Sequence, residues 1–144
     1  MLVKSFELAF IEAKRFSKAG EKVNNVRVDH NSTVTQIVKG AESTAVIDYR
    51  FTTNYVGMGY IKIEGQVVVA GDVDALIDEW TKKNSMPPEW ANLVHNTVVP
   101  NCIPTALLVA RDIRLPPPVP MPHINIQQAP APKKPGDYRG PEVA

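Results

Sequence analysis

Between Ile47 and Val69 the sequence reads IDYRFTTNYVGMGYIKIEGQVVV. Large apolar side chains fall on alternate residues before and after Gly57-Met58-Gly59, with charged or polar residues between them. A period of two is typical of a β-strand that buries one face, and the glycines supply a flexible turn. The stretch therefore predicts an antiparallel hairpin with one covered face and one solvated face.

Gly65 interrupts the apolar row of the second strand, between Ile63 and Val67. A glycine inside a strand often marks a β-bulge or a place where another group packs close to the backbone. We expect one of these two features at this position.

Another long strand is predicted before the hairpin, from about residue 23 to residue 39. Val28 and His30 alternate with charged residues, and β-branched residues follow as far as Val38. Gly40 ends the segment. The short connection after it allows the strand to pair with the hairpin.

The N-terminal segment fits two structures. Phe6, Leu8, Phe10 and Phe16 share the parity of one strand face. Phe6, Phe10 and Ala13 would equally share one helix face, and Glu, Ala and Lys are good helix formers. The residues alone fit both structures, and local propensity slightly favours the helix.

A first helix is predicted to begin at Asp72-Val73-Asp74, because acidic residues cap free amides and suit the positive end of the helix dipole. It should end before Asn84. A second helix is predicted to start at Pro87-Pro88-Glu89-Trp90, since proline is acceptable in the first turn. Its apolar residues recur every three to four positions up to Ile113.

Pro100 and Pro104 lie inside this second apolar pattern. Each would remove a helical hydrogen bond and cost about 3 kcal/mol in a regular helix. The segment is therefore either a kinked, nearly continuous helix or two short helices. We prefer the first, because the apolar period persists on both sides. Strands followed by helices predict an α+β domain with helices on one face of an antiparallel sheet.

The chain changes character at Leu115. Nine of the 13 prolines lie in residues 116–144, where large apolar residues are scarce. We predict a compact domain over residues 1–115 and an extended arm over residues 116–144, polyproline-like at its start. The arm either wraps its own domain or lies on a partner. Its candidate anchoring residues are Val119, Met121, Tyr138 and Arg139.

Composition excludes several classes of function. Sixteen basic and 15 acidic residues give a net charge of +1, which argues against phosphate-backbone binding as the main activity. A single cysteine allows no internal disulfide, and the three histidines are too scattered to predict a metal site. We expect no cofactor, no bilayer-spanning run and no signal peptide, and hence a cytoplasmic protein.

Catalytic residues are not evident either. Cys102 and His95 could suggest a thiol nucleophile and its base, but seven residues along one helix place them about 10 Å apart. Cys102 is therefore predicted to pack in the core. No phosphate-binding loop follows the glycines of the hairpin. We predict that the protein is not an enzyme.

Aromatic side chains gather around the hairpin and the helix starts. Tyr49 and Phe51 share the parity of Ile47 and should be core residues. Tyr60 has the opposite parity to Ile61, and Met58 lies at the turn. These two either pack in the core, which is the more usual role of such residues, or stay partly exposed and offer an adaptable apolar surface.

This pattern resembles the SecB-like chaperone family, particularly its small archaeal-type members, over about residues 5–126. The resemblance lies in Ile47–Phe51, Gly59–Gly65 with Val67–Val69, Glu79-Trp80, Pro88-Glu89-Trp90, and Ala106–Arg111 leading to Leu115–Pro120. It implies a four-stranded antiparallel sheet with the N-terminal segment as a strand, and an oligomer. The chain differs from SecB proper in its near-neutral charge and in its Pro-rich arm, which replaces a long C-terminal helix.

The resemblance also implies an ATP-independent holdase that binds unfolded polypeptide in an apolar groove. Candidate polypeptide-contacting residues are then Phe51, Tyr55, Met58 and Tyr60. The alternative is a non-catalytic accessory subunit of a larger assembly, anchored by the arm. Near-neutral charge favours a protein partner over RNA in both cases.

Overall fold

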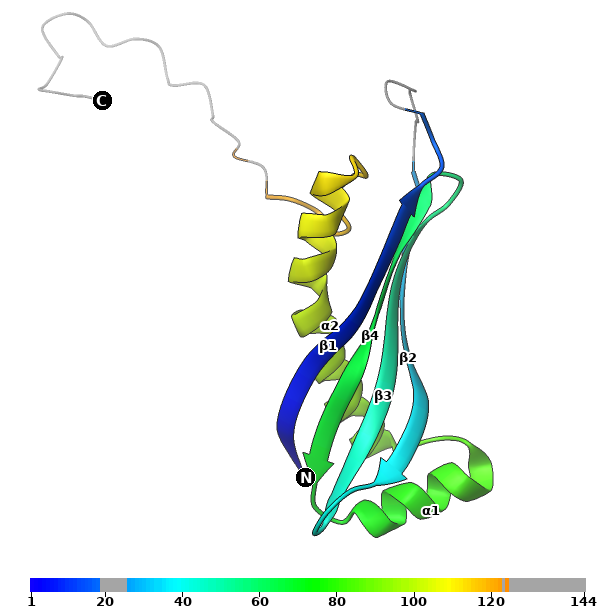
Figure 1. The fold of residues 1–144 in the computed structure, drawn as a ribbon, viewed down its shortest axis with the longest axis vertical. Helices are drawn as coiled ribbons and strands as arrows, with labels where there is room; N and C mark the ends of the chain where they lie inside the picture. The colour runs from blue at the N-terminus through cyan, green and yellow to red at the C-terminus, as the bar shows by residue number, and fades with distance from the viewer. Residues whose placement is uncertain (19–25, 123, 125–144) are drawn as a thin grey trace, which may run out of the picture.

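The computed structural model describes residues 1–18, 26–122 and 124. Four strands form one antiparallel sheet in the order β1-β4-β3-β2, and two helices follow them (Figure 1). The elements are β1 (Leu2–Arg15), β2 (Val28–Lys39), β3 (Thr44–Tyr55), β4 (Gly59–Ala70), α1 (Val73–Lys83) and α2 (Pro88–Asp112). The α+β class, the four-stranded antiparallel sheet and the N-terminal strand are confirmed.

The hairpin of β3 and β4 forms the centre of the sheet, as its alternating pattern predicts. Ile47, Phe51 and Ile63 are fully buried on the face that α2 covers, which we call the inner face. Arg50 and Glu64 pair with each other on the outer face, which neither α1 nor α2 covers. Burial therefore alternates from residue to residue along both strands, with one face covered and the other in solvent.

The side chains of Phe6, Leu8, Phe10 and Phe16 were expected on one face of a strand. This expectation was wrong, because β1 contains two shifts in register. Its register with β4 shifts between Val3 and Ser5 and again between Leu8 and Phe10. Each shift inserts an extra residue and reverses which face the following side chains occupy. Leu8 pairs with Gly65 on the inner face, whereas Phe10 pairs with Glu64 on the outer face.

The close packing predicted at Gly65 is confirmed, and the bulge lies opposite it in β1 rather than at Gly65 itself. A Cβ atom at this position would lie 2.6 Å from the Tyr49 hydroxyl and 2.9 Å from the Leu8 Cα, and it would also collide with the Glu7 carbonyl. The missing side chain lets Tyr49 lie across β4 and donate a hydrogen bond to the Glu7 carbonyl (3.1 Å). It also lets the bulged part of β1 approach.

One unbroken helix of 25 residues forms α2, despite its internal prolines. A row of residues spaced four apart is buried against the sheet: Trp90, Val94, Val98, Cys102, Ala106 and Ala110. Such a row is inclined to the helix axis and follows the twist of the sheet. Pro100 and Pro104 lie on the opposite, exposed side, where the lost hydrogen bonds face water.

The helix α2 corrects a second expectation. By length and composition alone it is long and apolar enough to cross a membrane, whereas the sequence was expected to hold no such run. Part of its apolar content is explained by the row that packs on the sheet.

Both helices end with a residue in the left-handed region. Asn84 (φ 54°) caps α1 and donates its backbone N–H to the Trp80 carbonyl. Arg114 (φ 61°) follows α2, and Leu115 donates to the Ala110 carbonyl (2.8 Å), which is a Schellman ending. At the start of α1, however, Asp72 makes no side-chain capping bond, so its predicted capping role was wrong.

The first part of the arm folds back on its own domain. Leu115 and Pro118 are buried, and the Pro116 carbonyl accepts a hydrogen bond from the Tyr55 hydroxyl (2.6 Å). His30 on β2 contacts the Pro118 carbonyl through Nε2 (2.7 Å). The arm thus lies over the end of the inner face.

We predict that Gly65→Ala lowers the free energy of unfolding by about 3 kcal/mol, because the added methyl group must displace the backbone of β1. Urea denaturation measures the change. Gly57→Ala is the matched control: its φ of 77° is strained for alanine, but nothing lies within 4 Å of the new atom. The control should cost about 1 kcal/mol. Equal losses in the two variants would contradict the close approach at Gly65.

Candidate functional site

Three of the four predicted polypeptide-contacting residues lie in the core. Phe51 and Tyr55 are completely buried on the inner face. Met58 is only 9% exposed, so the expectation that it would remain accessible at the turn was wrong. The turn folds against the end of β1, where Phe16 donates its backbone N–H to the Met58 carbonyl (2.7 Å). A polypeptide could reach Phe51 and Tyr55 only if α2 and the arm moved away.

Tyr60, the fourth residue, is partly exposed on the outer face, as its parity predicts. The ring of Phe16 lies beside it, with 5.9 Å between centroids. Phe10 is farther along β1 on the same face. Phe10 is 42% exposed and Phe16 is 56% exposed. We call Phe10, Phe16 and Tyr60 the outer aromatic strip.

Charged side chains hold this strip in place. Lys62 lies over the Phe10 ring (5.8 Å) and pairs with Glu12 (3.3 Å). Glu12 accepts a hydrogen bond from the Tyr60 hydroxyl (3.1 Å), which raises the pKa of Tyr60 above its ordinary value. Tyr60 therefore remains neutral at physiological pH and keeps its hydroxyl as a donor.

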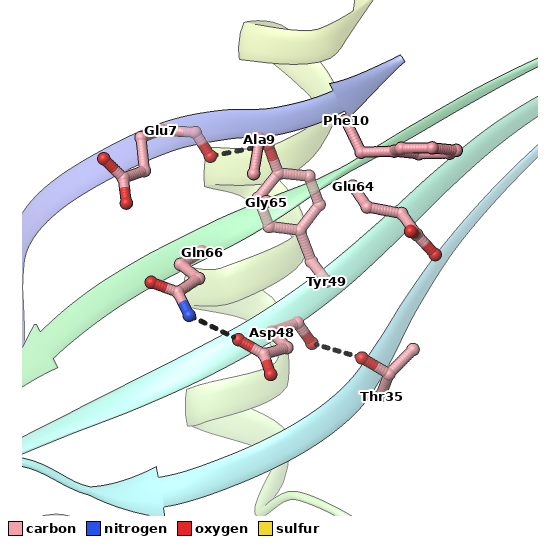
Figure 2. A pocket seen from close by; sticks show the side chains of 9 residues that line it. All are labelled: Glu7, Ala9, Phe10, Thr35, Asp48, Tyr49, Glu64, Gly65 and Gln66. Carbon is pink, nitrogen blue, oxygen red and sulfur yellow. Dashed lines mark hydrogen bonds between the residues drawn. The ribbon is translucent and has the colours of Figure 1, made fainter. Parts of the chain in front are cut away.

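A hollow of about 390 Å³ adjoins the strip on the outer face (Figure 2). The ring of Phe10 borders it, and three carboxylates line it: Glu7, Asp48 and Glu64. Gln66 donates to Asp48 Oδ1 (3.0 Å), and Arg50 contacts Glu64 Oε2 (2.7 Å). Each of these two carboxylates has a second oxygen that can accept from a bound cation.

The strip and the hollow together offer two kinds of contact within one surface. Exposed aromatic rings can pack against apolar side chains, and the carboxylates can pair with basic ones. An extended polypeptide that alternates such side chains fits this chemistry. Sequence reasoning missed Phe10 and Phe16, because only the shifts in the β1 register turn these rings to the outer face.

Two histidines bridge distant parts of the inner face, which the sequence did not reveal. His95 Nδ1 on α2 lies 2.7 Å from Ser32 Oγ on β2. His30 Nδ1 lies 3.0 Å from Thr53 Oγ1, and the His30 ring stacks on Phe51. These pairs satisfy polar groups beneath α2 and beneath the arm, and so they stabilise the closed inner face.

Cys102 is fully buried in the core, as predicted. Burial raises the pKa of its thiol to about 11. A reactive thiol needs a lowered pKa and access to solvent, and Cys102 has neither. Within residues 1–18, 26–122 and 124, no group of three or more His, Cys, Asp and Glu side chains could hold a metal ion.

The four anchoring residues predicted for the arm have different positions. Val119 is partly buried, and Met121 is 48% exposed beside α2. Tyr138 and Arg139 lie outside the described residues.

Comparison with protein-family models, with curated proteins and with solved structures found no match.

Ionisation of Cys102 should weaken the fold at alkaline pH. Because the pKa of the thiol is raised from 9.0 to about 11 in the folded state, its contribution to stability is complete below pH 9 and is lost as the pH rises toward 11. The free energy of unfolding in urea should therefore fall less steeply between pH 8 and about pH 10.5 in Cys102→Ala than in the unmodified protein. Parallel slopes would contradict the assignment.

Proposed function

We propose that the protein is a non-catalytic, ATP-independent polypeptide-binding module of the SecB-like kind, acting as a holdase in the cytoplasm. The observation that carries the proposal is the outer aromatic strip, an exposed apolar surface on a rigid sheet beside a hollow lined by carboxylates. A four-stranded antiparallel sheet with two C-terminal helices is also the architecture that the SecB-like resemblance implies.

The position of the strip determines how a client would bind. The rings extend from the middle of β1 to its end. Lys62 lies over Phe10, Lys14 lies over Phe16, and Glu12 accepts a hydrogen bond from Tyr60. A bound segment would lie along β1 and β4, with apolar side chains on the rings and basic side chains toward Glu7 and Asp48. Each contact is weak, so release needs no nucleotide hydrolysis.

The proposal predicts that the protein suppresses light scattering by an unfolding client at stoichiometric ratios. Replacing both Phe10 and Phe16 by serine should raise the client dissociation constant by about tenfold or more, because two aromatic contacts are lost. Val38→Ser is the matched control. Val38 is an exposed apolar residue on the same sheet face, but it lies in the edge strand β2, away from the strip.

The proposal fails if the unmodified protein gives no suppression. It also fails if the Phe10→Ser/Phe16→Ser variant and the Val38→Ser control lose activity equally. Circular dichroism checks that both variants remain folded.

A second candidate is an accessory subunit of a protein assembly, with the distal part of the arm bound to a partner. The start of the arm favours this role. The carbonyls of Pro116 and Pro118 are hydrogen-bonded to the domain, so the position from which the rest of the arm extends is fixed. In this role residues beyond Met121 would make the contact with the partner.

Two truncations separate the proximal arm from the distal arm. Ending the chain after Leu115 removes the carbonyls that bind Tyr55 and His30, and should lower the free energy of unfolding by about 2–3 kcal/mol. Deleting residues 129–144 should leave the melting temperature unchanged and weaken copurification of a partner from native extract. A lower melting temperature in the second truncation, or undiminished copurification, would contradict this role.

A further inference from the structure

A groove of about 440 Å³ lies between the end of α2 and the arm. The arm turns back beside the last turns of the helix and forms the second wall (Figure 1). One guanidinium and otherwise only apolar side chains line the groove: Arg111, Leu107, Leu108, Leu115, Pro117 and Met121. A concave site of this size, with an apolar lining and a single charged group, is typical of sites that bind small molecules.

The groove has one fixed wall and one adaptable edge. Pro117 lies between Pro116 and Pro118, whose carbonyls are both hydrogen-bonded to the domain. Leu115, at the start of this wall, is only 5% exposed. Met121 lies beyond the last of these hydrogen bonds and is 48% exposed. A methionine side chain is unbranched and flexible, so it can close over ligands of different shape.

An apolar ligand in the groove would cover surface that the fold leaves in water. Leu108 on α2 is 55% exposed, and Met121 on the arm is exposed to a similar degree. Burying these two side chains is favourable, because it removes apolar area from water. Neither side chain belongs to the core. A ligand can therefore reach both of them without opening the fold.

Arg111 makes the groove selective for anions. It contacts the adjacent Asp112 at 3.4 Å, but both side chains are mostly exposed, and such a pair contributes little to stability. The sequence between Glu89 and Arg111 contains no charged residue, so this part of α2 supplies no competing carboxylate. A guanidinium binds a carboxylate through two parallel hydrogen bonds. The ligand group that best matches Arg111 is therefore a carboxylate.

The end of α2 does not oppose an anion at this place. The last carbonyls of a helix carry partial negative charge, but here the backbone N–H groups of residues 113–115 donate to carbonyls of the final turns. Arg114 follows Asp112, so two arginines and one aspartate at the end of the helix give a local charge of +1. The outer face differs in this respect, because three carboxylates line its hollow.

We propose that the groove binds a free fatty acid of medium chain length. The alkyl chain would lie between Leu108 and Met121, against Pro117, and the carboxylate would contact Arg111. None of the lining residues belongs to the outer aromatic strip or to the hollow beside it. The inference therefore does not depend on the proposed function.

Isothermal titration calorimetry of the full chain with sodium laurate, below its critical micelle concentration, tests the proposal. One laurate should bind to each chain. Decanoate and octanoate should bind more weakly, with the dissociation constant rising about two- to fourfold for each CH₂ removed, because each one buries less apolar area.

Substitutions and a neutral analogue separate the two parts of the site. Arg111→Gln should raise the dissociation constant for decanoate by about tenfold or more and leave that for 1-decanol unchanged, because only the carboxylate loses its partner. Leu108→Ser should weaken both ligands to a similar extent. Lys83→Gln, at an exposed position on α1, is the matched control and should change neither.

Nuclear magnetic resonance locates the bound ligand. The chain has four methionines, and ¹³C labelling of their methyl groups gives one signal for each. The signal that Met121→Leu removes should shift the most when laurate is added. A larger shift at Met1, Met58 or Met86 would contradict the assignment to this groove.

Several results would overturn the proposal. These are no binding of laurate, unchanged decanoate binding in Arg111→Gln, or equal affinity for decyltrimethylammonium. Loss of laurate binding in the Phe10→Ser/Phe16→Ser variant would place the ligand on the outer aromatic strip instead. Sedimentation with phosphatidylglycerol vesicles that Arg111→Gln abolishes, without binding of free laurate, would overturn it in favour of a lipid surface. A mass above that of the monomer that Leu108→Ser reduces, again without laurate binding, would overturn it in favour of a second copy.

Discussion

The side chain of Tyr49 connects parts of the fold that are far apart in sequence. It starts on β3, crosses Gly65 on β4, and donates its hydroxyl to the Glu7 carbonyl on β1. Its ring stacks on Phe6 with 5.1 Å between centroids, and its hydroxyl interacts with Cys102 on α2. Burial is the main reason that the pKa of Tyr49 lies far above its ordinary value, so the hydroxyl remains a donor.

The hydrogen bond from Tyr49 to the Glu7 carbonyl lies next to the register shift that moves the aromatic side chains of β1 from the inner face to the outer face. Holding the Glu7 carbonyl above Gly65 draws the strand toward β4 just before the register shift at Ala9. After the shift, Phe10 lies on the outer face, and the later aromatic residue Phe16 joins Tyr60 there. The outer aromatic strip is therefore a consequence of how one buried tyrosine is accommodated over one glycine.

The sheet and the helix α2 each have one buried side and one exposed side. The sheet buries its inner face beneath α2 and leaves the strip exposed, while α2 buries one row and leaves Pro100, Pro104 and Leu108 exposed on its other side. At the end of the inner face, Tyr55 and His30 form hydrogen bonds to the arm, which covers this part of the sheet.

The hairpin and both helices could be predicted because their signals are local. Alternation at Ile47, Tyr49 and Phe51, the glycine turn and the proline run each act on neighbouring residues. The accessible site could not be predicted in the same way. Met58 is buried because the end of β1 closes over the turn, and Phe10 is exposed because of a bulge opposite Gly65.

By itself, the sequence determined where the central hairpin and the two helices form and which face of the hairpin is buried, because periodicity and turn chemistry operate over a few residues. It did not determine that the N-terminal segment is a strand. Only the tertiary structure decided which aromatic residues remain accessible, which histidines find partners, and where the arm lies. Those outcomes depend on strand register and on contacts between residues such as His30 and Pro118, which lie far apart in the chain and meet only after folding.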